Sequence, residues 1–211
     1  MDEQSARQSL VEACRAMNAL GINQGTSGNI SVRHGETMLI SPSATPYDAM
    51  QPNEIAAMPL DADGWHGPLQ PSTEWRFHRD ILRARPEIGA VIHSHPTFCT
   101  TLAIARRNIP ACHYMVAAFG GPDVRCADYA TFGTQELSDH ALRALEGRNA
   151  CLLANHGMIA CGPTLARAMW LAVELEAIAR QYYHSLLIGG PHLLSDAQIA
   201  ETARKLSTYG V

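Results

Sequence analysis

The sequence predicts an α/β fold in which a central, mainly antiparallel sheet is flanked by helices. Segments with helical periodicity alternate with short apolar runs of strand length, and no long linker or repeat interrupts them. Two pairs of these runs are joined by turns that are too short for a helical crossover, which favours antiparallel neighbours. The chain also lacks the G-x-G-x-x-G and P-loop motifs of doubly wound nucleotide-binding sheets.

The first part of the chain is expected to hold two helices with a hairpin between them. Residues 3–20 form an amphipathic pattern that ends at Gly21. The stretch "GTSGNISV" then leads into one strand, and "TMLISP" supplies the next. Ser72 is expected to cap a helix that runs to about Ala84, because the residue before Pro86 is disfavoured in a helix. The strand "AVIHSHP" follows directly.

Four further helices are expected, each beginning at a residue that suits a helix N-terminus: Pro96, Thr134, Thr164 and Ser195. The third of these is the longest and runs to about Ile188, and the last has the S-x-x-Q pattern of a capping box and ends near Tyr209. Between the second and third, "NACLLANHGMIACG" predicts two strands around a tight turn at residues 155–157.

Composition narrows the class of partner. The 211 residues, 46% of them hydrophobic, suffice for one compact domain, expected to span residues 1–211. The net charge is −4 without any run of Lys or Arg, so a nucleic-acid partner is not expected. No apolar stretch reaches the roughly 20 residues of a membrane span, and the polar N-terminus is unlike a signal peptide, so we expect a cytoplasmic protein without a membrane partner. The six cysteines form no C-x-x-C pair and are expected to be reduced thiols.

Two histidines lie in the strand "AVIHSHP". Side chains alternate along a strand, so His93 and His95 leave the same face as Val91. Neutral imidazoles paired in this way are good zinc ligands. His156, in the turn between two apolar strands, is a third candidate, because a rigid scaffold can aim a loop residue at a site. The alternatives are hydrogen-bonded core histidines and an exposed turn histidine.

A catalytic metal site also needs an acid or base and a place for its substrate. Glu74, at the start of the helix that leads into the histidine strand, is the candidate acid/base; the alternative is a carboxylate favoured by the helix dipole. The loop "GTSGNIS" can form an anion-binding nest, or be only a glycine-rich turn. "SPSATP" and "PSTE" add hydroxyls, although Ser72 can be only a cap. Three such clusters could meet at one phosphate.

Seven motifs in order along the chain resemble those of the class II aldolase and adducin head family: "GTSGNISVR", "LISPSATPYD", "STEWRFH", "HSHP", "IPACHYM", "YATFGTQELS" and "NHGMIACG". The resemblance implies an α/β fold and a C4 homotetramer with active sites between neighbouring subunits. It further implies a zinc-dependent aldolase that reversibly cleaves a ketose 1-phosphate into dihydroxyacetone phosphate and a short aldehyde. Candidate substrates are L-fuculose 1-phosphate and the related 5-deoxypentulose and 5-methylthioribulose 1-phosphates.

Carried over by position, the resemblance implies that His93, His95 and His156 bind zinc, for which manganese or cobalt can substitute. It implies that Glu74 is the acid/base and also a ligand of the resting metal. The implied phosphate pocket consists of Thr26, Gly28, Asn29, Ser43, Ala44, Ser72 and Thr73, with Ala44 standing where the family has glycine. Tyr114 would reach in from the neighbouring subunit as a second catalytic residue, and Phe132 and Tyr209 would lie near the aldehyde.

The cleavage chemistry supports a metal independently of the resemblance. Breaking the bond between carbons 3 and 4 leaves charge that needs an electron sink, which aldolases supply with a lysine Schiff base or a metal. The only lysine, Lys205, lies outside the inner face that Ile199, Ala203 and Leu206 are expected to form in the last helix. A pentulose-5-phosphate 4-epimerase is the main alternative, but that branch has an aspartate where this chain has Glu74. A non-catalytic adducin-like module would have no reason to keep a base beside three histidines.

Overall fold

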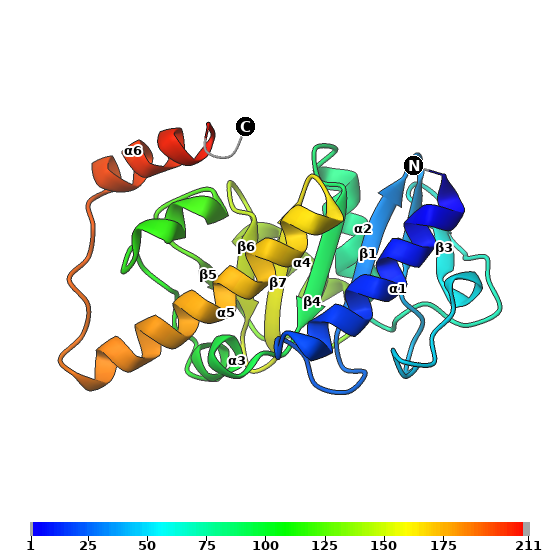
Figure 1. Ribbon diagram of the computed structural model, residues 1–211, viewed down its shortest axis with the longest axis horizontal. Helices are drawn as coiled ribbons and strands as arrows, with labels where there is room; N and C mark the ends of the chain where they lie inside the picture. The colour runs from blue at the N-terminus through cyan, green and yellow to red at the C-terminus, as the bar shows by residue number, and fades with distance from the viewer. Residues whose placement is uncertain (1, 209–211) are drawn as a thin grey trace.

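The computed structural model describes residues 2–208, and a seven-stranded sheet runs through the middle of them (Figure 1). The strands are β1 (Asn29–His34), β2 (Thr37–Ile40), β3 (Ala56–Pro59), β4 (Ala90–Ser94), β5 (Arg125–Ala127), β6 (Ala150–Leu153) and β7 (Gly157–Gly162). Their order across the sheet is β3-β2-β1-β4-β7-β6-β5, and every neighbouring pair is antiparallel except β5 and β6. The predicted mainly antiparallel sheet is confirmed.

Helices cover both faces of this sheet. They are α1 (Glu3–Ala19), α2 (Trp75–Ala84), α3 (Thr97–Ile104), α4 (Gln135–Ala144), α5 (Leu165–Leu187) and α6 (Asp196–Leu206), with short 3₁₀ segments η1 (Pro52–Glu54) and η2 (Tyr114–Phe119). Figure 1 shows α1 and α5 in front of the sheet and α2 and α4 behind it. Alternate strand residues enter two apolar clusters, so that Ile92 packs on the α1 and α5 side and Val91 on the α2 and α4 side.

The local sequence signals locate most of these elements. Thr134, Thr164 and Ser195 each cap a helix through the side-chain oxygen, as predicted, and Ser195 and Gln198 form a complete capping box. The two predicted hairpins are β1–β2 and β6–β7. Two short strands, β3 and β5, were not predicted. They lie at the two edges of the sheet, and segments of three or four residues carry too little periodicity to be recognised.

Helix α2 begins later than predicted. Its first residue is Trp75, and Glu74 rather than Ser72 stands at the N-cap. The cause is tertiary, since the Ser72 backbone N–H donates to the Ser41 carbonyl at 3.0 Å and ties this segment to the chain that leaves β2. The Ser72 hydroxyl instead accepts from the Glu74 N–H at 3.3 Å. The Glu74 carboxylate caps no helix and can therefore face the sheet.

Helix α6 packs on η2 and has a narrower buried face than expected. Ile199 is buried, as predicted, and Leu206 is half-buried. Ala203, by contrast, is exposed, and Thr202 takes the half-buried position beside Leu206. The prediction for Ala203 was wrong because the main element packed against α6 within residues 2–208 is the short 3₁₀ segment η2, which covers less of the helix than a sheet would.

Helix α3 is fixed by a residue from another helix. Its N-cap, Pro96, has no side chain that can accept a hydrogen bond. The carboxylate of Glu176 on α5 accepts instead from the Phe98 N–H at 2.9 Å and from the Cys99 N–H at 2.8 Å. A negative charge at a helix N-terminus is favoured by the helix dipole as well as by these bonds. Glu176 therefore anchors the segment that continues β4 into α3.

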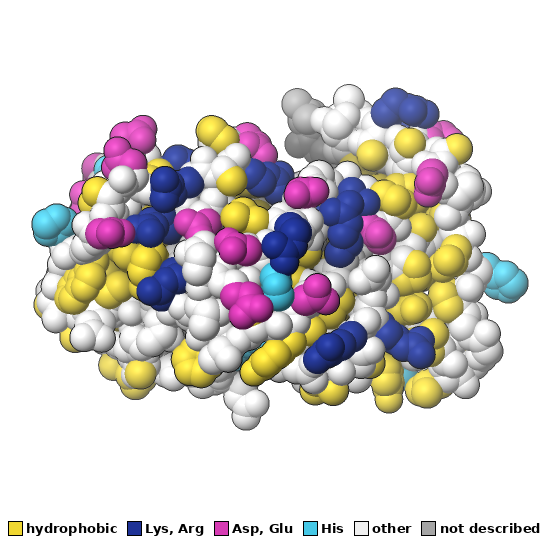
Figure 2. All heavy atoms as spheres, turned by 180° about the vertical axis from the view of Figure 1, so that it is seen from behind, with side chains coloured by type: hydrophobic (Ala, Val, Ile, Leu, Met, Phe, Trp, Pro, Cys, Tyr) yellow, Lys and Arg dark blue, Asp and Glu magenta, His cyan; other side chains and the backbone are white. Residues whose placement is uncertain are grey.

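The surface and the thiols agree with the expectations from composition. Figure 2 shows acidic and basic side chains interspersed over the face that α2 and α4 cover. Apolar side chains gather toward the end of the molecule that carries α6 (Figure 2). All six cysteines are free thiols. No helix within residues 2–208 is long and apolar enough to cross a membrane.

Replacing Glu176 with alanine removes the acceptor for the first turn of α3. We expect Glu176→Ala to lower the free energy of unfolding by about 1–3 kcal/mol, the range for hydrogen bonds to a charged group. Urea denaturation followed by circular dichroism measures this change. Glu174→Ala is the matched control, since Glu174 lies on the same helix and its carboxylate makes no hydrogen bond within residues 2–208. Equal loss of stability in both variants would contradict the anchoring role.

Candidate metal centre

Three histidines meet at one end of the central strands. His93 lies on β4, His95 immediately follows β4, and His156 lies in the turn before β7. Because β4 and β7 are antiparallel neighbours, the end of one strand lies beside the start of the other. The Nε2 atoms of His93 and His95 are 3.0 Å apart, and the candidate ligand atoms of all three rings lie within 4.8 Å of one another. The structure thus brings together all three histidines that the sequence singled out.

The orientation of the His93 ring is set by the backbone. Its Nδ1 lies 2.9 Å from the Met158 carbonyl, which can only accept, so Nδ1 carries a hydrogen and Nε2 is the ring atom that faces the cluster. Gly157 makes room for the neighbouring ring. A Cβ at this position would lie 2.5 Å from Cδ2 of His95 and 2.5 Å from the Ser94 carbonyl oxygen. Only glycine permits this close approach.

Glu74 closes the cluster from the helix side. Its carboxylate is buried, with Oε2 at 3.1 Å from His93 Nε2 and Oε1 at 3.3 Å from His156 Nε2. Asn29 donates from Nδ2 to Oε2 at 3.0 Å, whereas Oε1 accepts no hydrogen bond within residues 2–208. Burial raises the pKa of Glu74, but the interactions with His93, His156 and Asn29 outweigh it and hold the pKa well below the ordinary value. The carboxylate is therefore ionised at neutral pH.

These donors fit a divalent cation. Burial, with the neighbouring His93 and His156, lowers the pKa of His95 to about 3; burial, with His93, lowers that of His156 to about 4. Both rings are thus neutral at pH 7 and offer lone pairs. Nitrogen ligands about 2.1 Å from a tetrahedral zinc ion stand about 3.4 Å apart, close to the 3.0 Å between the Nε2 atoms of His93 and His95. An ion in this position would also satisfy the orphaned Oε1 of Glu74.

The three hydroxyl-bearing segments of the expected phosphate pocket are tied together. The Ser43 N–H donates to the Gln70 carbonyl at 3.0 Å, next to the "PSTE" segment. The Tyr47 hydroxyl donates to the Gly28 carbonyl in the glycine-rich loop. A Cβ on Gly28 would lie 2.7 Å from the His93 carbonyl oxygen, so glycine is required there.

The residues of the expected phosphate pocket differ in how exposed they are to a ligand. The exposed residues are Thr26, Ala44 and Thr73, while Ser43 is half-buried and Gly28, Asn29 and Ser72 are buried. Ala44 has φ of 52°, in the left-handed region that glycine adopts without strain. The Asn29 amide already donates to Glu74 and accepts from His78, which leaves one side-chain N–H for a ligand.

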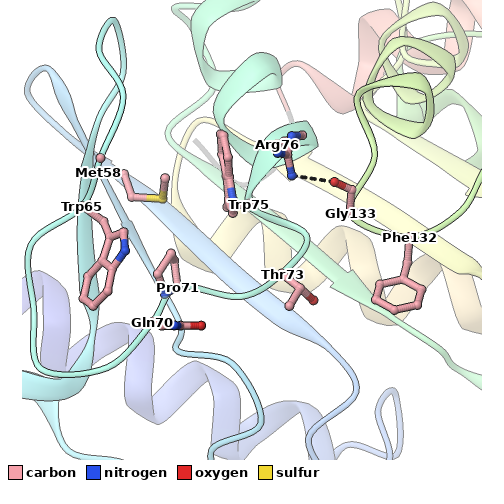
Figure 3. Close-up of a pocket in the computed structure, with 10 residues that line it drawn as sticks. Met58, Trp65, Gln70, Pro71, Thr73, Trp75, Arg76, Phe132 and Gly133 are labelled. Atoms are coloured by element: carbon pink, nitrogen blue, oxygen red, sulfur yellow. Dashed lines mark hydrogen bonds between the residues drawn. The ribbon is translucent and has the colours of Figure 1, made fainter.

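A cavity of about 330 Å³ opens at the histidines. It is lined by Ser27, Thr73, Glu74, His95, Tyr129, Ala130, Phe132, Asn155 and His156. Phe132 is 63% exposed and forms part of the wall; its expected place at the aldehyde end stays a prediction. A second cavity of about 450 Å³ shares Thr73 and Phe132 with the first (Figure 3). Arg76 donates to the Gly133 carbonyl at 2.6 Å and so holds the loop that carries Phe132 (Figure 3).

Tyr114 does not lie at this site within the described chain, and Tyr209 is not among the described residues. Tyr114 lies on η2, is 52% exposed, and lines a different cavity beside α5 and α6. Its expected role requires a second subunit and stays a prediction. Tyr209 lies outside the described residues, so its role also stays a prediction.

Sequence reasoning missed several residues at or beside the site. Tyr129 and Asn155 line the cavity, although the motifs "YATFGTQELS" and "NHGMIACG" contain them. His78, on the buried face of α2, is wholly buried and bonded to polar groups. Burial, with the neighbouring His93, lowers the pKa of His78 to about 3, so this ring is neutral. Only its tertiary contacts distinguish it from a packing residue.

Comparison with known proteins gives consistent matches over most of the chain. The model of the class II aldolase and adducin N-terminal domain family matches residues 8–183. A 5-methylthioribulose-1-phosphate/5-deoxyribulose-1-phosphate aldolase of Rhodospirillum rubrum is 52% identical over 97% of this chain and 92% of its own length. An L-fuculose phosphate aldolase of Escherichia coli is 45% identical over 100% of this chain and 98% of its own. A solved L-fuculose 1-phosphate aldolase superposes with a TM-score of 0.92 at 36% identity, covering 95% of both chains.

The donor set predicts that the purified protein binds about one zinc ion per chain through the three histidines. His95→Ala should weaken metal affinity by more than the roughly 10–100-fold that is typical of losing an outer partner of a ligand. Competition with a chelator and elemental analysis measure this. His66→Ala serves as the control, because His66 is exposed and lies outside the cluster. Full zinc occupancy in His95→Ala would refute the assignment.

Proposed function

The chain belongs to the class II aldolase and adducin N-terminal domain family, and from this premise we propose that it is an aldolase that cleaves a ketose 1-phosphate reversibly. The products would be dihydroxyacetone phosphate and a short aldehyde. The observation that carries the proposal is the meeting of three imidazoles with an ionised, buried carboxylate beside a cavity that Glu74, His95 and His156 line. The names of the relatives support L-fuculose 1-phosphate, 5-methylthioribulose 1-phosphate and 5-deoxyribulose 1-phosphate as candidate substrates.

His93, His95 and His156 would hold zinc, with manganese or cobalt as substitutes, and Glu74 would ligate it in the resting enzyme. When bound, zinc supplies Lewis-acid stabilisation of the negative charge that develops at the substrate carbonyl, an effect worth several kcal/mol. The protein contributes the orientation of its ligands. The bond from His93 Nδ1 to the Met158 carbonyl fixes one ring.

Glu74 is suited to move the proton in this reaction. It is ionised, it lines the cavity, and its Oε1 accepts no hydrogen bond within the described part of the chain. In the condensation direction its carboxylate would take a proton from the carbon beside the carbonyl of dihydroxyacetone phosphate. In cleavage the same carboxyl group would return that proton, so that one residue serves as base and acid.

The two ends of the substrate would meet different surfaces. The phosphate would be bound by hydroxyls and backbone N–H groups of the three linked segments, with Thr26, Ser43 and Thr73 as the accessible side chains. The aldehyde end would face Phe132 and Tyr129, whose rings suit a methyl or methylthiomethyl group. This placement puts the scissile bond between the phosphate loops and the aromatic wall, at the histidines.

Assembly into a homotetramer would complete the site. Tyr114 is half-exposed on η2 and lines a cavity of its own chain that contains none of the three histidines. A neighbouring copy could bring its Tyr114 to this cavity, where the phenol would stabilise the oxygen of the departing aldehyde. The exposed apolar residues Leu187, Ile188 and Leu193, which follow one another where α5 leads toward α6, are suited to such an interface.

A product assay on a panel of ketose 1-phosphates tests the reaction. We expect release of dihydroxyacetone phosphate and an aldehyde that a strong chelator abolishes and added zinc restores. Borohydride added with substrate should leave activity intact, because the side chain of Lys205 is 78% exposed and paired with Glu201 at 3.1 Å, unlike a buried Schiff-base amine. Trapping by borohydride together with resistance to the chelator would overturn the metal mechanism.

Glu74→Gln keeps the size of the side chain and removes its basicity. Turnover should fall by roughly 10²–10⁴, the usual contribution of a general acid/base. Metal content measured on the same sample should stay close to one ion per chain, since three histidines remain. Glu87→Gln is the control, because Glu87 is exposed and pairs with Arg85 on the surface. An unchanged rate in Glu74→Gln with metal bound would return Glu74 to a structural role.

A further inference from the structure

A chain of buried hydrogen bonds leads away from Glu74 into the interior. Asn29 Nδ2 lies 3.0 Å from Glu74 Oε2, Asn29 Oδ1 lies 2.5 Å from His78 Nε2, and His78 Nδ1 lies 2.8 Å from Ser31 Oγ. Ser31 and His78 are fully buried, and Asn29 is 4% exposed. Asn29 and Ser31 leave the same face of β1, and Glu74 and His78 lie one turn apart at the start of α2.

Hydrogen-bond chemistry fixes the direction of every step in this chain. An ionised carboxylate can only accept, so Asn29 must present its N–H groups to Glu74 and its oxygen to the other side. That oxygen can only accept, so His78 must carry its hydrogen on Nε2. His78 Nδ1 is then a bare acceptor, and the Ser31 hydroxyl must donate to it. Each of the three polar side chains behind Glu74 is bonded to the next, and only one arrangement of donors and acceptors satisfies these bonds.

We propose that His78 is a positioning residue for Glu74, acting through Asn29 with its tautomer fixed by Ser31. The bond from His78 Nε2 holds the Asn29 amide with its N–H toward the carboxylate. Without that donor the amide can rotate and turn its oxygen toward Glu74, which repels the carboxylate and displaces it from the cavity. The inference rests on the acid/base role proposed above for Glu74, and it adds two residues, His78 and Ser31, that neither line the cavity nor belong to the histidine cluster.

A packing role alone does not account for these contacts. Phe77 stacks on the His78 ring at 4.7 Å between centroids and contacts the apolar cluster on this side of the sheet, so a hydrophobic side chain would fill the same space. A buried polar group is costly unless it is bonded, and here each one is bonded to the next. The hydrogen bonds of Ser31, His78 and Asn29 therefore position Glu74, the group at the end of this hydrogen-bonded series that faces the cavity.

Two substitutions at His78 separate the hydrogen bond from the volume. His78→Leu removes the donor and should lower kcat roughly 10–100-fold, the usual cost of losing an outer partner of a site residue. KM and zinc content should change little, since the substrate and metal contacts remain. His78→Gln restores a side-chain N–H that can reach Asn29 and should recover most of the lost kcat. Equal kcat in the Leu and Gln variants would overturn the proposal.

The double variant with Glu74→Gln shows whether His78 acts through Glu74. Because the carboxylate is already gone, adding His78→Leu to Glu74→Gln should cause no further loss of kcat. His78→Leu should nevertheless lower the thermal stability of the wild type and of Glu74→Gln by similar amounts. The same fold-loss of kcat in both backgrounds would overturn the inference while leaving the proposed function intact. Wild-type activity in Glu74→Gln alone would refute the proposed role of Glu74 instead.

A pair of buried serines gives a milder test that does not depend on the folding of the His78 variants. Ser31 and Ser94 are both fully buried on neighbouring strands, but the Ser94 hydroxyl has no partner within residues 2–208. Ser31→Ala should lower kcat roughly two- to tenfold, the range for one neutral hydrogen bond, with zinc content unchanged. Ser94→Ala should match the wild type. Equal kcat in Ser31→Ala, Ser94→Ala and the wild type would overturn the assignment.

Discussion

The rest of the site depends on one constraint: a nitrogen atom and a carboxylate oxygen both lie close to the Nε2 atom of His93. A second imidazole nitrogen lies 3.0 Å away and a carboxylate oxygen 3.1 Å away, and the side chains of His93 and Glu74 are buried. Such groups repel one another unless a cation or a proton lies between them. Three neighbouring features make this close approach of the side chains possible. They are the antiparallel pairing of β4 and β7, the absence of a side chain at Gly157, and the amide of Asn29.

The helices on the two faces of the sheet make different contributions to the site. The α1 and α5 side of the sheet forms the larger apolar cluster and carries Glu176, which anchors the chain just after His95. The α2 side delivers Glu74 and His78 to the same end of the sheet. The ligands are therefore supported from both faces, and none of them depends on a long loop for its position. This rigidity suits a site that must hold four donors close together before any ion arrives.

The proposed phosphate end of the site has little positive charge nearby. Within residues 2–208, no Lys or Arg lines the cavity at the histidines, and the accessible hydroxyls belong to segments tied together by hydrogen bonds. Neutral donors in fixed positions would suit a dianion without neutralising the Glu74 carboxylate, which a lysine beside Glu74 would do. The aromatic wall of Phe132 and Tyr129, held in part by the bond from Arg76 to Gly133, is then left to recognise the less polar end of a substrate.

Short-range patterns in the sequence determined the helix caps at Thr134, Thr164 and Ser195, the hairpins, and the presence of a histidine pair on one strand face. These features depend on neighbours a few residues apart, so the local sequence carries them. Tertiary structure alone decided the start of α2, the edge strands β3 and β5, and the role of Glu176. It also decided that a histidine on the apolar face of α2 bonds to Asn29, 49 positions earlier in the chain. Hydrogen bonds between residues so far apart exist only once the sheet has paired, and no local periodicity encodes them.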